Sequence, residues 1–150
     1  MTEPFHDPAI HLQILSRPEL LAPVRALVNT MAAHEGLDDL AACHLVLAMD
    51  EALTNVIRHG YDGDPDGRIW ISISALQDGA GIRVVIEDRA RTVDPDALQS
   101  RDLEDVRPGG LGMHLMRTLV DRFEHLPRAE GGMRVVLEKR ATRDAAAAIA

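Results

Sequence analysis

The chain has 150 residues, enough for one domain with a real core, and its hydrophobic (46%) and charged (27%) fractions are ordinary for a soluble globular protein. The formal net charge of -8 argues against a general binder of nucleic acid or anionic membranes, because both need a basic surface. The single Cys43 excludes an intramolecular disulfide, and neither a signal-like N-terminus nor about eighteen consecutive apolar residues occur, so we expect a cytoplasmic protein.

Hydrophobic periodicity and turn residues predict a mixed order of strands and helices. In chain order we expect a strand over residues 10–15, a helix over 19–33, a helix from Asp38 or Asp39 to near Gly60, a hairpin of strands over 68–76 and 82–87, a helix over 111–123 and a strand over 133–138. This order predicts an α/β (α+β) two-layer sandwich, a mostly antiparallel sheet with helices on one face. We expect one domain over residues 1–150, with a core of about 10–139 and an Ala-rich tail at 141–150 that is frayed or a short helix.

The end of the second predicted helix carries the most informative pattern. Glu51, Asn55 and His59 recur every four residues, which places them on one helix face about one turn apart. The rest of the segment is largely apolar, so these polar groups should line a pocket, because unpaired polar atoms are costly to bury. An acid followed by an amide suits an oxygen-seeking cation such as Mg²⁺, whereas Asn is a poor zinc ligand. His59 alone would more simply pack at the helix end.

Two further signals follow along the chain. Glycines lie just before and within the start of the helix predicted at 111–123, where they let the backbone approach a ligand and leave N–H groups for phosphate oxygens. A flexible helix entry would look similar, but this one ends a long polar connection typical of a lid or binding loop. Asp88 ends an apolar strand, where a carboxylate can accept hydrogen bonds from an exocyclic amine, although an ordinary turn residue would also fit. Arg122 and Arg128 are expected on the solvated surface.

Taken in order, these three signals resemble the GHKL, or Bergerat-type, ATP-binding domain, and within it the single-domain anti-sigma-factor serine kinases. Residues 51–55 (EALTN) followed by 59–61 (HGY) look like that family's N box, and residues 109–115 (GGLGMHL) look like its second glycine box at the end of the ATP lid. Asp88 matches the acid of the first glycine box. The resemblance spans about residues 10–139 and implies ATP bound between the N-box helix, the sheet and the lid.

The resemblance implies a role for each matched residue. Asn55 would coordinate Mg²⁺ bridging the phosphates, Glu51 would orient or deprotonate the attacking hydroxyl, and Asp88 would read the adenine amino group. Arg107 would add positive charge as the γ-phosphoryl group transfers. The implied nucleotide-binding residues are Asn55, Asp88, Ala90, Arg107, Gly109, Gly110, Leu111, Gly112 and Met113.

A family member of this type would be a transferase that moves the γ-phosphoryl group of ATP to a serine of an anti-anti-sigma (STAS-domain) protein. Its second partner would be a sigma factor, held until that antagonist competes for it, so that partner switching regulates transcription. Such proteins are commonly homodimers. Neither direct nucleic-acid binding nor membrane binding is expected.

Two departures from the family pattern fall in the adenine pocket. Residues 88–90 are Asp-Arg-Ala where the family usually has Asp-x-Gly, and Gly132–Met133 stands where relatives often carry a Thr. If position 90 needed a positive φ, Ala would cost roughly 1 kcal/mol or more and reshape the pocket. A non-catalytic module of the same fold that sequesters a sigma factor or another regulator therefore stays open as an alternative. A detached histidine-kinase catalytic domain is a third, but no additional helical hairpin supplies its phosphoacceptor His.

Overall fold

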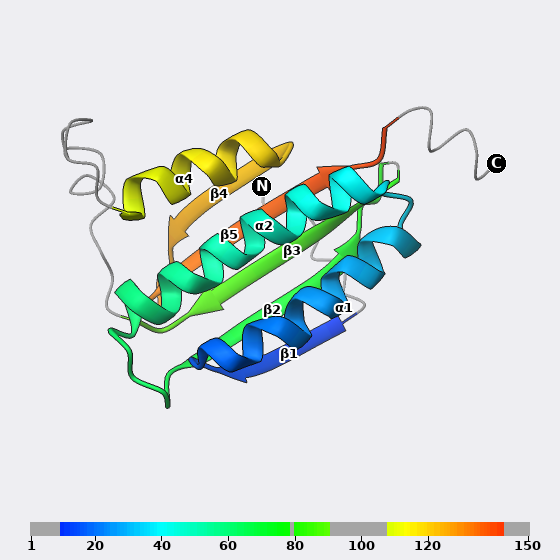
Figure 1. The fold of residues 1–150 in the computed structure, drawn as a ribbon. Coiled ribbons are helices and arrows are strands. Elements are labelled where there is room, and N and C mark those ends of the chain that lie inside the picture. Colours follow the sequence, from blue (N-terminus) through cyan, green and yellow to red (C-terminus); the bar gives the residue numbers. More distant parts are fainter. Residues whose placement is uncertain (1–9, 79, 91–107, 143–150) are drawn as a thin grey trace.

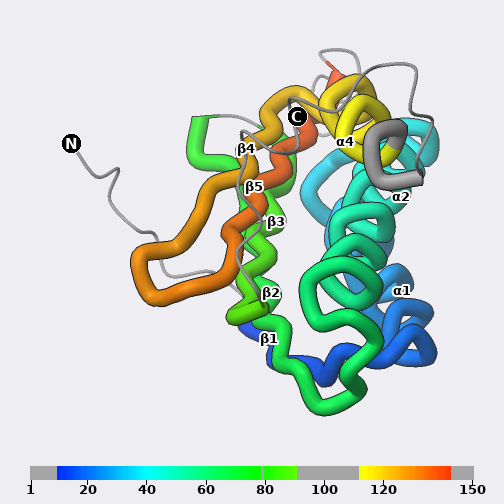
Figure 2. The backbone as a smooth tube through the Cα atoms, turned by 90° about the vertical axis from the view of Figure 1, so that its left-hand side faces the viewer, coloured from blue at the N-terminus to red at the C-terminus, as the bar shows by residue number. Residues whose placement is uncertain are grey.

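The computed structural model of the chain describes residues 10–78, 80–90 and 108–142, and for residues 108–111 it describes the backbone only. The strands form one sheet in the order β1-β2-β3-β5-β4, and each neighbouring pair runs antiparallel. The helices α1, α2 and α4 cover one face of this sheet (Figure 1). In the view turned by 90°, the sheet and the helices form two separate layers (Figure 2). The predicted two-layer α/β fold is confirmed.

Most predicted elements lie close to their expected bounds. The strands are β1 Ile10–Leu15, β2 Arg68–Ala75, β3 Gly81–Asp88, β4 Arg122–Pro127 and β5 Met133–Arg140. The helical segments are η1 Pro18–Leu20, α1 Leu21–His34, α2 Asp39–Asn55, η2 Val56–Gly60 and α4 Pro108–Leu119. The polar connection over 91–107 and the tail beyond residue 142 lie outside the described residues.

The helix α2 lies over the centre of the sheet. Asp38 is its N-cap, because the Asp38 Oδ1 accepts a hydrogen bond of 2.7 Å from the Ala41 amide. Its buried face, with Leu45, Met49 and Leu53, packs on alternate residues of the strands. By length and apolar composition alone, Asp39–Gly60 could also cross a membrane, but half of its apolar window is buried in this core. Burial of this kind is typical of the central helix of a globular domain.

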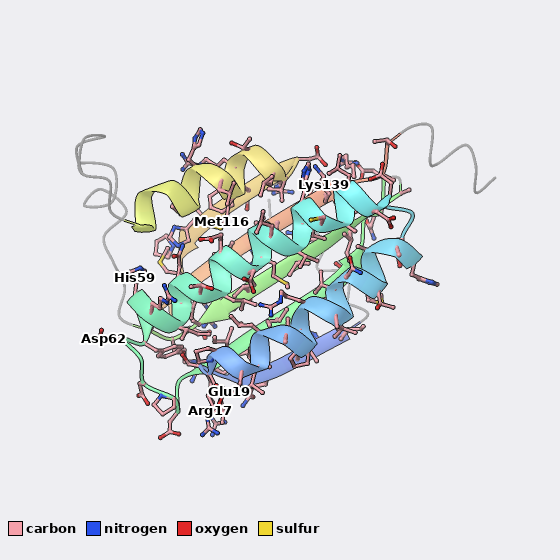
Figure 3. All side chains as sticks on the ribbon, in the orientation of Figure 1. Arg17, Glu19, His59, Asp62, Met116 and Lys139 are labelled. Atoms are coloured by element: carbon pink, nitrogen blue, oxygen red, sulfur yellow. The ribbon has the colours of Figure 1, made fainter. Side chains whose placement is uncertain are left out.

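The last turn of this helix is a π turn. The Tyr61 amide donates to the carbonyl of Val56, five residues earlier, at 2.8 Å. Glu51 and Asn55 lie one α-helical turn apart, before the π turn begins. His59 is exposed at the helix end (Figure 3), whereas Glu51 and Asn55 are half-buried. Glu51 and Asn55 share a face, since a Cβ at Gly112 would lie near both, whereas the position of His59 on that face stays a prediction.

The helix predicted over residues 111–123 is wrong at its C-terminal end. It ends at Leu119, and the edge strand β4 follows, paired with β5. Polar and apolar residues alternate in this strand: Arg122 reaches across to Glu138 of β5 (Nη1 to Oε1, 3.3 Å), while Phe123 packs against the core. Phe123 also fits the helical spacing of the leucines and methionines before it, so the alternation of a strand at this point was not recognised in the sequence.

Candidate active site

The central part of the site is the contact between α2 and the start of α4. A Cβ at Gly112 would stand 2.9 Å from the Glu51 Oε2 and 3.7 Å from the Asn55 Nδ2. The backbone of α4 therefore comes directly against the two polar side chains of α2. Met116, one turn further along α4, is buried between α4 and α2 and holds the two helices together (Figure 3). The structure thus brings Glu51, Asn55 and Gly112 together, as predicted.

Of the two adjacent acids in the motif, only Glu51 faces α4. Asp50 points to the other neighbouring helix, where its Oδ1 accepts a hydrogen bond of 2.8 Å from the Arg25 guanidinium of α1. Consecutive residues of an α-helix are rotated by about 100° around its axis, so Asp50 and Glu51 face different neighbouring helices. Asp50 is accounted for by this ion pair, which leaves Glu51 as the acid of the site.

Asp88 forms a second polar centre at the end of β3. The residue is only 3% exposed, and its Oδ1 accepts hydrogen bonds from the amides of Ala90 (2.8 Å) and Met133 (3.3 Å). A buried carboxylate needs such donors, because an unpaired buried charge is strongly unfavourable. Both bonds use Oδ1, and no donor among the described residues bonds Oδ2, so Oδ2 can accept a hydrogen bond from a ligand.

The backbone of residues 88–90 is held on both sides. The Tyr61 hydroxyl accepts a hydrogen bond of 2.9 Å from the Arg89 amide and donates its own proton to the carbonyl of Arg68. The Arg128 guanidinium donates to the carbonyl of Asp88 at 2.6 Å. The Asp88 carbonyl and the Arg89 amide belong to the same peptide group, so the peptide that follows the Asp88 carboxylate is held at both of its polar atoms.

Ala90 fits its position without backbone strain. Among the described residues, Asp62 is the one non-glycine residue with a positive φ, so Ala90 does not need the conformation that favours glycine. Its methyl group lies against Gly60 of η2, where a Cβ would stand 2.9 Å away. The departure from the usual Asp-x-Gly is accommodated because the facing residue is itself a glycine.

Gly132 was not predicted as a site residue, but it lies directly against Asp88. Its φ is +83°, and a Cβ there would overlap the Asp88 carbonyl oxygen and stand 2.6 Å from the carbonyl carbon. Arg128 was expected on the solvated surface, and this is wrong, since its side chain is only 15% exposed and binds the Asp88 carbonyl. The pair of glycines before the last strand was a usable sequence signal for Gly132, whereas nothing in the sequence pointed to Arg128.

His125 of β4 lies in the half-buried region between the sheet and α4. Burial lowers the pKa of His125, the charge of Asp88 opposes that shift, and the positive charge of Arg117 adds to it. The His125 ring stacks on Phe123 at 6.5 Å between centroids, and the Arg117 guanidinium lies 5.6 Å from the Phe123 centroid. His125 is thus a half-buried imidazole near Asp88 whose pKa lies below its ordinary value.

The remaining predicted site residues belong to the start of α4 and the connection before it. Gly109, Gly110 and Leu111 lie in the first turns of α4, and Met113 is half-buried against the core. Arg107 lies outside the described residues. Within the described ranges, no group of three or more His, Cys, Asp or Glu side chains could hold a metal ion.

Comparisons with known proteins agree with this arrangement. A family model described as the histidine kinase-like ATPase domain matches residues 14–139. The serine-protein kinase RsbW of Listeria innocua is 32% identical over 123 residues, which cover 77% of this chain and 77% of the relative. The RsbW of Bacillus subtilis is 28% identical over 120 residues, covering 75% of this chain and 74% of the relative.

Two solved structures share the fold. The RsbU and RsbW domains of a Mycobacterium tuberculosis protein superpose with a TM-score of 0.65 at 21% identity, over 89% of this chain and 32% of that one. The histidine kinase domain of a blue-light activated histidine kinase from Erythrobacter litoralis EL346 gives a TM-score of 0.55 at 19% identity, over 85% of this chain and 62% of that one. From the family match and the shared identity, the chain belongs to the histidine kinase-like ATPase family and, within it, to the group of the RsbW serine-protein kinases.

Proposed function

We propose that this protein is an anti-sigma factor and an ATP-dependent serine-protein kinase that phosphorylates a serine of an anti-anti-sigma (STAS-domain) protein. The observation that carries the proposal is the meeting of Glu51, Asn55 and the Gly112 backbone, with Asp88 buried at the end of the neighbouring strand. The relatives named RsbW, which are 27–32% identical to this chain over the aligned residues, support the same activity.

ATP binds between Asp88 and the start of α4. The free Oδ2 of Asp88 accepts a hydrogen bond from the exocyclic amine of adenine, and the Ala90 methyl lies beside the base. The backbone amides of Gly109, Gly110 and Leu111, in the first turn of α4, donate to the β- and γ-phosphates, and Gly112 and Met113 line the site directly after them. The first amides of a helix lack partners within the helix, and the helix dipole also favours an anion there. Arg107 adds positive charge at the γ-phosphate.

Asn55 is the protein ligand proposed for Mg²⁺. The amide oxygen of Asn is a suitable hard donor, and the lack of a carboxylate or imidazole cluster among the described residues fits an ion held mainly by phosphates and water. When bound, Mg²⁺ neutralises phosphate charge. Asn55 keeps this position fixed because it lies on a buried helix, one turn from Glu51.

Glu51 acts on the substrate. It accepts a hydrogen bond from the serine hydroxyl and takes its proton as the hydroxyl oxygen bonds to the γ-phosphorus and the bond to the β–γ bridging oxygen breaks, releasing ADP. Because the transition state of phosphoryl transfer is loose, the carboxylate contributes more by orienting the hydroxyl than by its basicity. The missing side chain at Gly112 leaves room for the carboxylate at this point.

The proposed function includes two protein partners. The STAS-domain protein is the substrate, a sigma factor is the protein held inactive, and the kinase acts as a homodimer of single-domain chains in the cytoplasm. The alternative of a nucleotide-free binding module rested on Ala90 and on Gly132–Met133, and the first of these supports is removed because Ala90 does not have a positive φ.

Calorimetric titration tests the proposal. ATP and ADP are titrated with and without Mg²⁺ into wild type, Asn55→Ala and Asn29→Ala, the last being an exposed Asn on α1 that serves as control. We expect Mg²⁺-dependent binding in wild type and the control, and a loss of about tenfold or more in Asn55→Ala, equivalent to about 1.4 kcal/mol. Glu51→Gln should still bind ATP while losing transfer to a STAS-domain protein. A folded wild type that binds no nucleotide would contradict the kinase and leave the binding module.

A further inference from the structure

We propose that Arg128 is a positioning residue for base recognition: from the β4–β5 hairpin it fixes the Asp88 peptide and so aims the Asp88 carboxylate at the adenine amine. The inference rests on the proposed function, because it assigns a role toward ATP. It concerns a residue that belongs to none of the family motifs in this sequence.

The guanidinium of Arg128 contacts three acceptor groups at this end of the sheet. Nη1 donates to the Asp88 carbonyl at 2.6 Å, Nε lies 2.9 Å from the Glu87 Oε2, and Nη2 lies 3.3 Å from the Glu130 Oε2. The Arg128 guanidinium also lies 6.0 Å from the centroid of the Trp70 ring. A planar, permanently charged fork can bind several acceptors at once in a fixed geometry, which the ammonium of Lys cannot reproduce.

The position of the Asp88 carbonyl explains why a side-chain donor is needed. The registered pairs of β3 with β5 end at Glu87 and Arg134, so the Asp88 peptide lies just beyond the β3–β5 ladder, although Asp88 still pairs with Ile69 of β2 on the other side. The hairpin turns at the same end of the sheet (Figure 1), which brings Arg128 to this carbonyl. A charged donor to a half-buried carbonyl is a strong, directional restraint.

The same hairpin also contacts the Asp88 side chain. The Arg128 amide donates to the Gly132 carbonyl at 2.9 Å, and the Gly131 amide donates to the Arg128 carbonyl at 3.1 Å, which closes the hairpin loop. From this loop, Gly132 packs on the Asp88 carbonyl and the Met133 amide donates to the Asp88 Oδ1. Arg128 therefore links the hairpin to the Asp88 peptide, while Gly132 and Met133 of the same hairpin position the Asp88 carboxylate. Without the guanidinium, this peptide keeps only the Tyr61 contact at the Arg89 amide, and the direction of Oδ2 is less tightly restrained.

The test compares two nucleotides that differ at the group Asp88 reads. ATP carries an exocyclic amine, and inosine triphosphate carries a carbonyl oxygen in its place. Both are titrated calorimetrically with Mg²⁺ into full-length wild type, Arg128→Met and Arg128→Lys. We expect Arg128→Met to lower ATP affinity about tenfold and inosine triphosphate affinity less than about twofold, so that the preference for ATP collapses. Arg128→Lys keeps the charge without the fork and should lose most of the preference while remaining folded.

Arg140→Met is the matched control. It removes an arginine that pairs with Asp78 at 3.0 Å through both Nη atoms, at the opposite end of β5, and it should leave the preference for ATP unchanged. Equal losses for the two nucleotides, or a lower melting temperature with an unchanged preference, would overturn this inference and leave the proposed function intact. A folded wild type that binds neither nucleotide would overturn both.

Discussion

The backbone of Gly112 lies so close to the carboxylate of Glu51 that a methyl group at position 112 would stand 2.9 Å from Oε2. The atom that must give way is the end of a flexible side chain, so the helix itself need not move. An alanine here would therefore displace the carboxylate of Glu51 while the fold is kept.

Gly112→Ala should separate activity from stability. We expect an unchanged or higher free energy of unfolding, because Ala is up to about 1 kcal/mol better than Gly inside a helix. Phosphoryl transfer should fall by about tenfold to a hundredfold, since a misplacement of about 1 Å at a reacting group can cost that much. Thr118→Ala, on the exposed face of the same helix, is the control for propensity. Wild-type transfer rates in Gly112→Ala would show that Glu51 does not act where we place it.

Gly131→Ala and Gly132→Ala form a matched pair of adjacent changes. Both glycines have positive φ, +95° and +83°, so each substitution should cost about 1 kcal/mol from the backbone alone. A Cβ at Gly131 meets nothing within 4 Å, whereas a Cβ at Gly132 collides with the Asp88 peptide. We expect chemical denaturation to show a further loss of about 1–3 kcal/mol in Gly132→Ala, accompanied by weaker ATP binding. Equal stabilities for the two variants would mean that the hairpin shifts freely away from Asp88.

Sequence reasoning located the parts of the fold that depend on local patterns. The first strand was predicted with its observed bounds, and the cap at Asp38 was one of two residues proposed. The alignment of Glu51 with Asn55 followed from helical spacing alone. The sequence showed that Ala90 departs from the family pattern in the expected adenine pocket, but not whether alanine fits there. Its φ and its contact with Gly60 depend on how η2 packs against the end of β3.

What the sequence could not provide were contacts between distant segments. Arg128 and Asp88 are forty residues apart, and an arginine in a polar stretch gives no sign that its guanidinium will reach a buried peptide. The strand β4 was not predicted, because Phe123 fits both the helical spacing and the alternation of a strand. The π turn at the end of α2 depends on a single additional residue in the turn, which helical spacing in the sequence does not reveal.

Tyr61→Phe should loosen the Asp88 turn without disturbing the core. Phe retains the ring that packs over Gly67, where a Cβ would stand 2.5 Å from the ring, and loses only the hydroxyl that bridges Arg89 and Arg68. We expect about 1 kcal/mol less stability and faster hydrogen exchange at the Arg89 amide, with ATP affinity reduced. Tyr61→Leu, which removes the ring as well, should be clearly less stable. Unaltered exchange at Arg89 in Tyr61→Phe would mean that the hydroxyl does not restrain the turn.

His125 should make stability depend on pH in the mildly acidic range. Burial lowers its pKa in the folded protein, so below the unfolded value of about 6.5 the unfolded chain binds a proton that the folded chain does not. Its contribution is therefore fully present above about pH 6.5 and is lost as the pH falls through the lowered folded pKa.

Urea unfolding of wild type and His125→Gln, at several pH values from about 7.5 to about 5, measures this contribution. The variant should lose less free energy of unfolding on acidification than wild type, because one proton acceptor of the unfolded state has gone. His34→Gln, a change at an exposed His near the end of α1, should follow wild type. If His125→Gln lost as much free energy of unfolding as wild type on acidification, protonation of His125 would be ruled out as a source of the acid sensitivity. The half-buried region beside α4 would then accept the charged imidazole without a loss of stability.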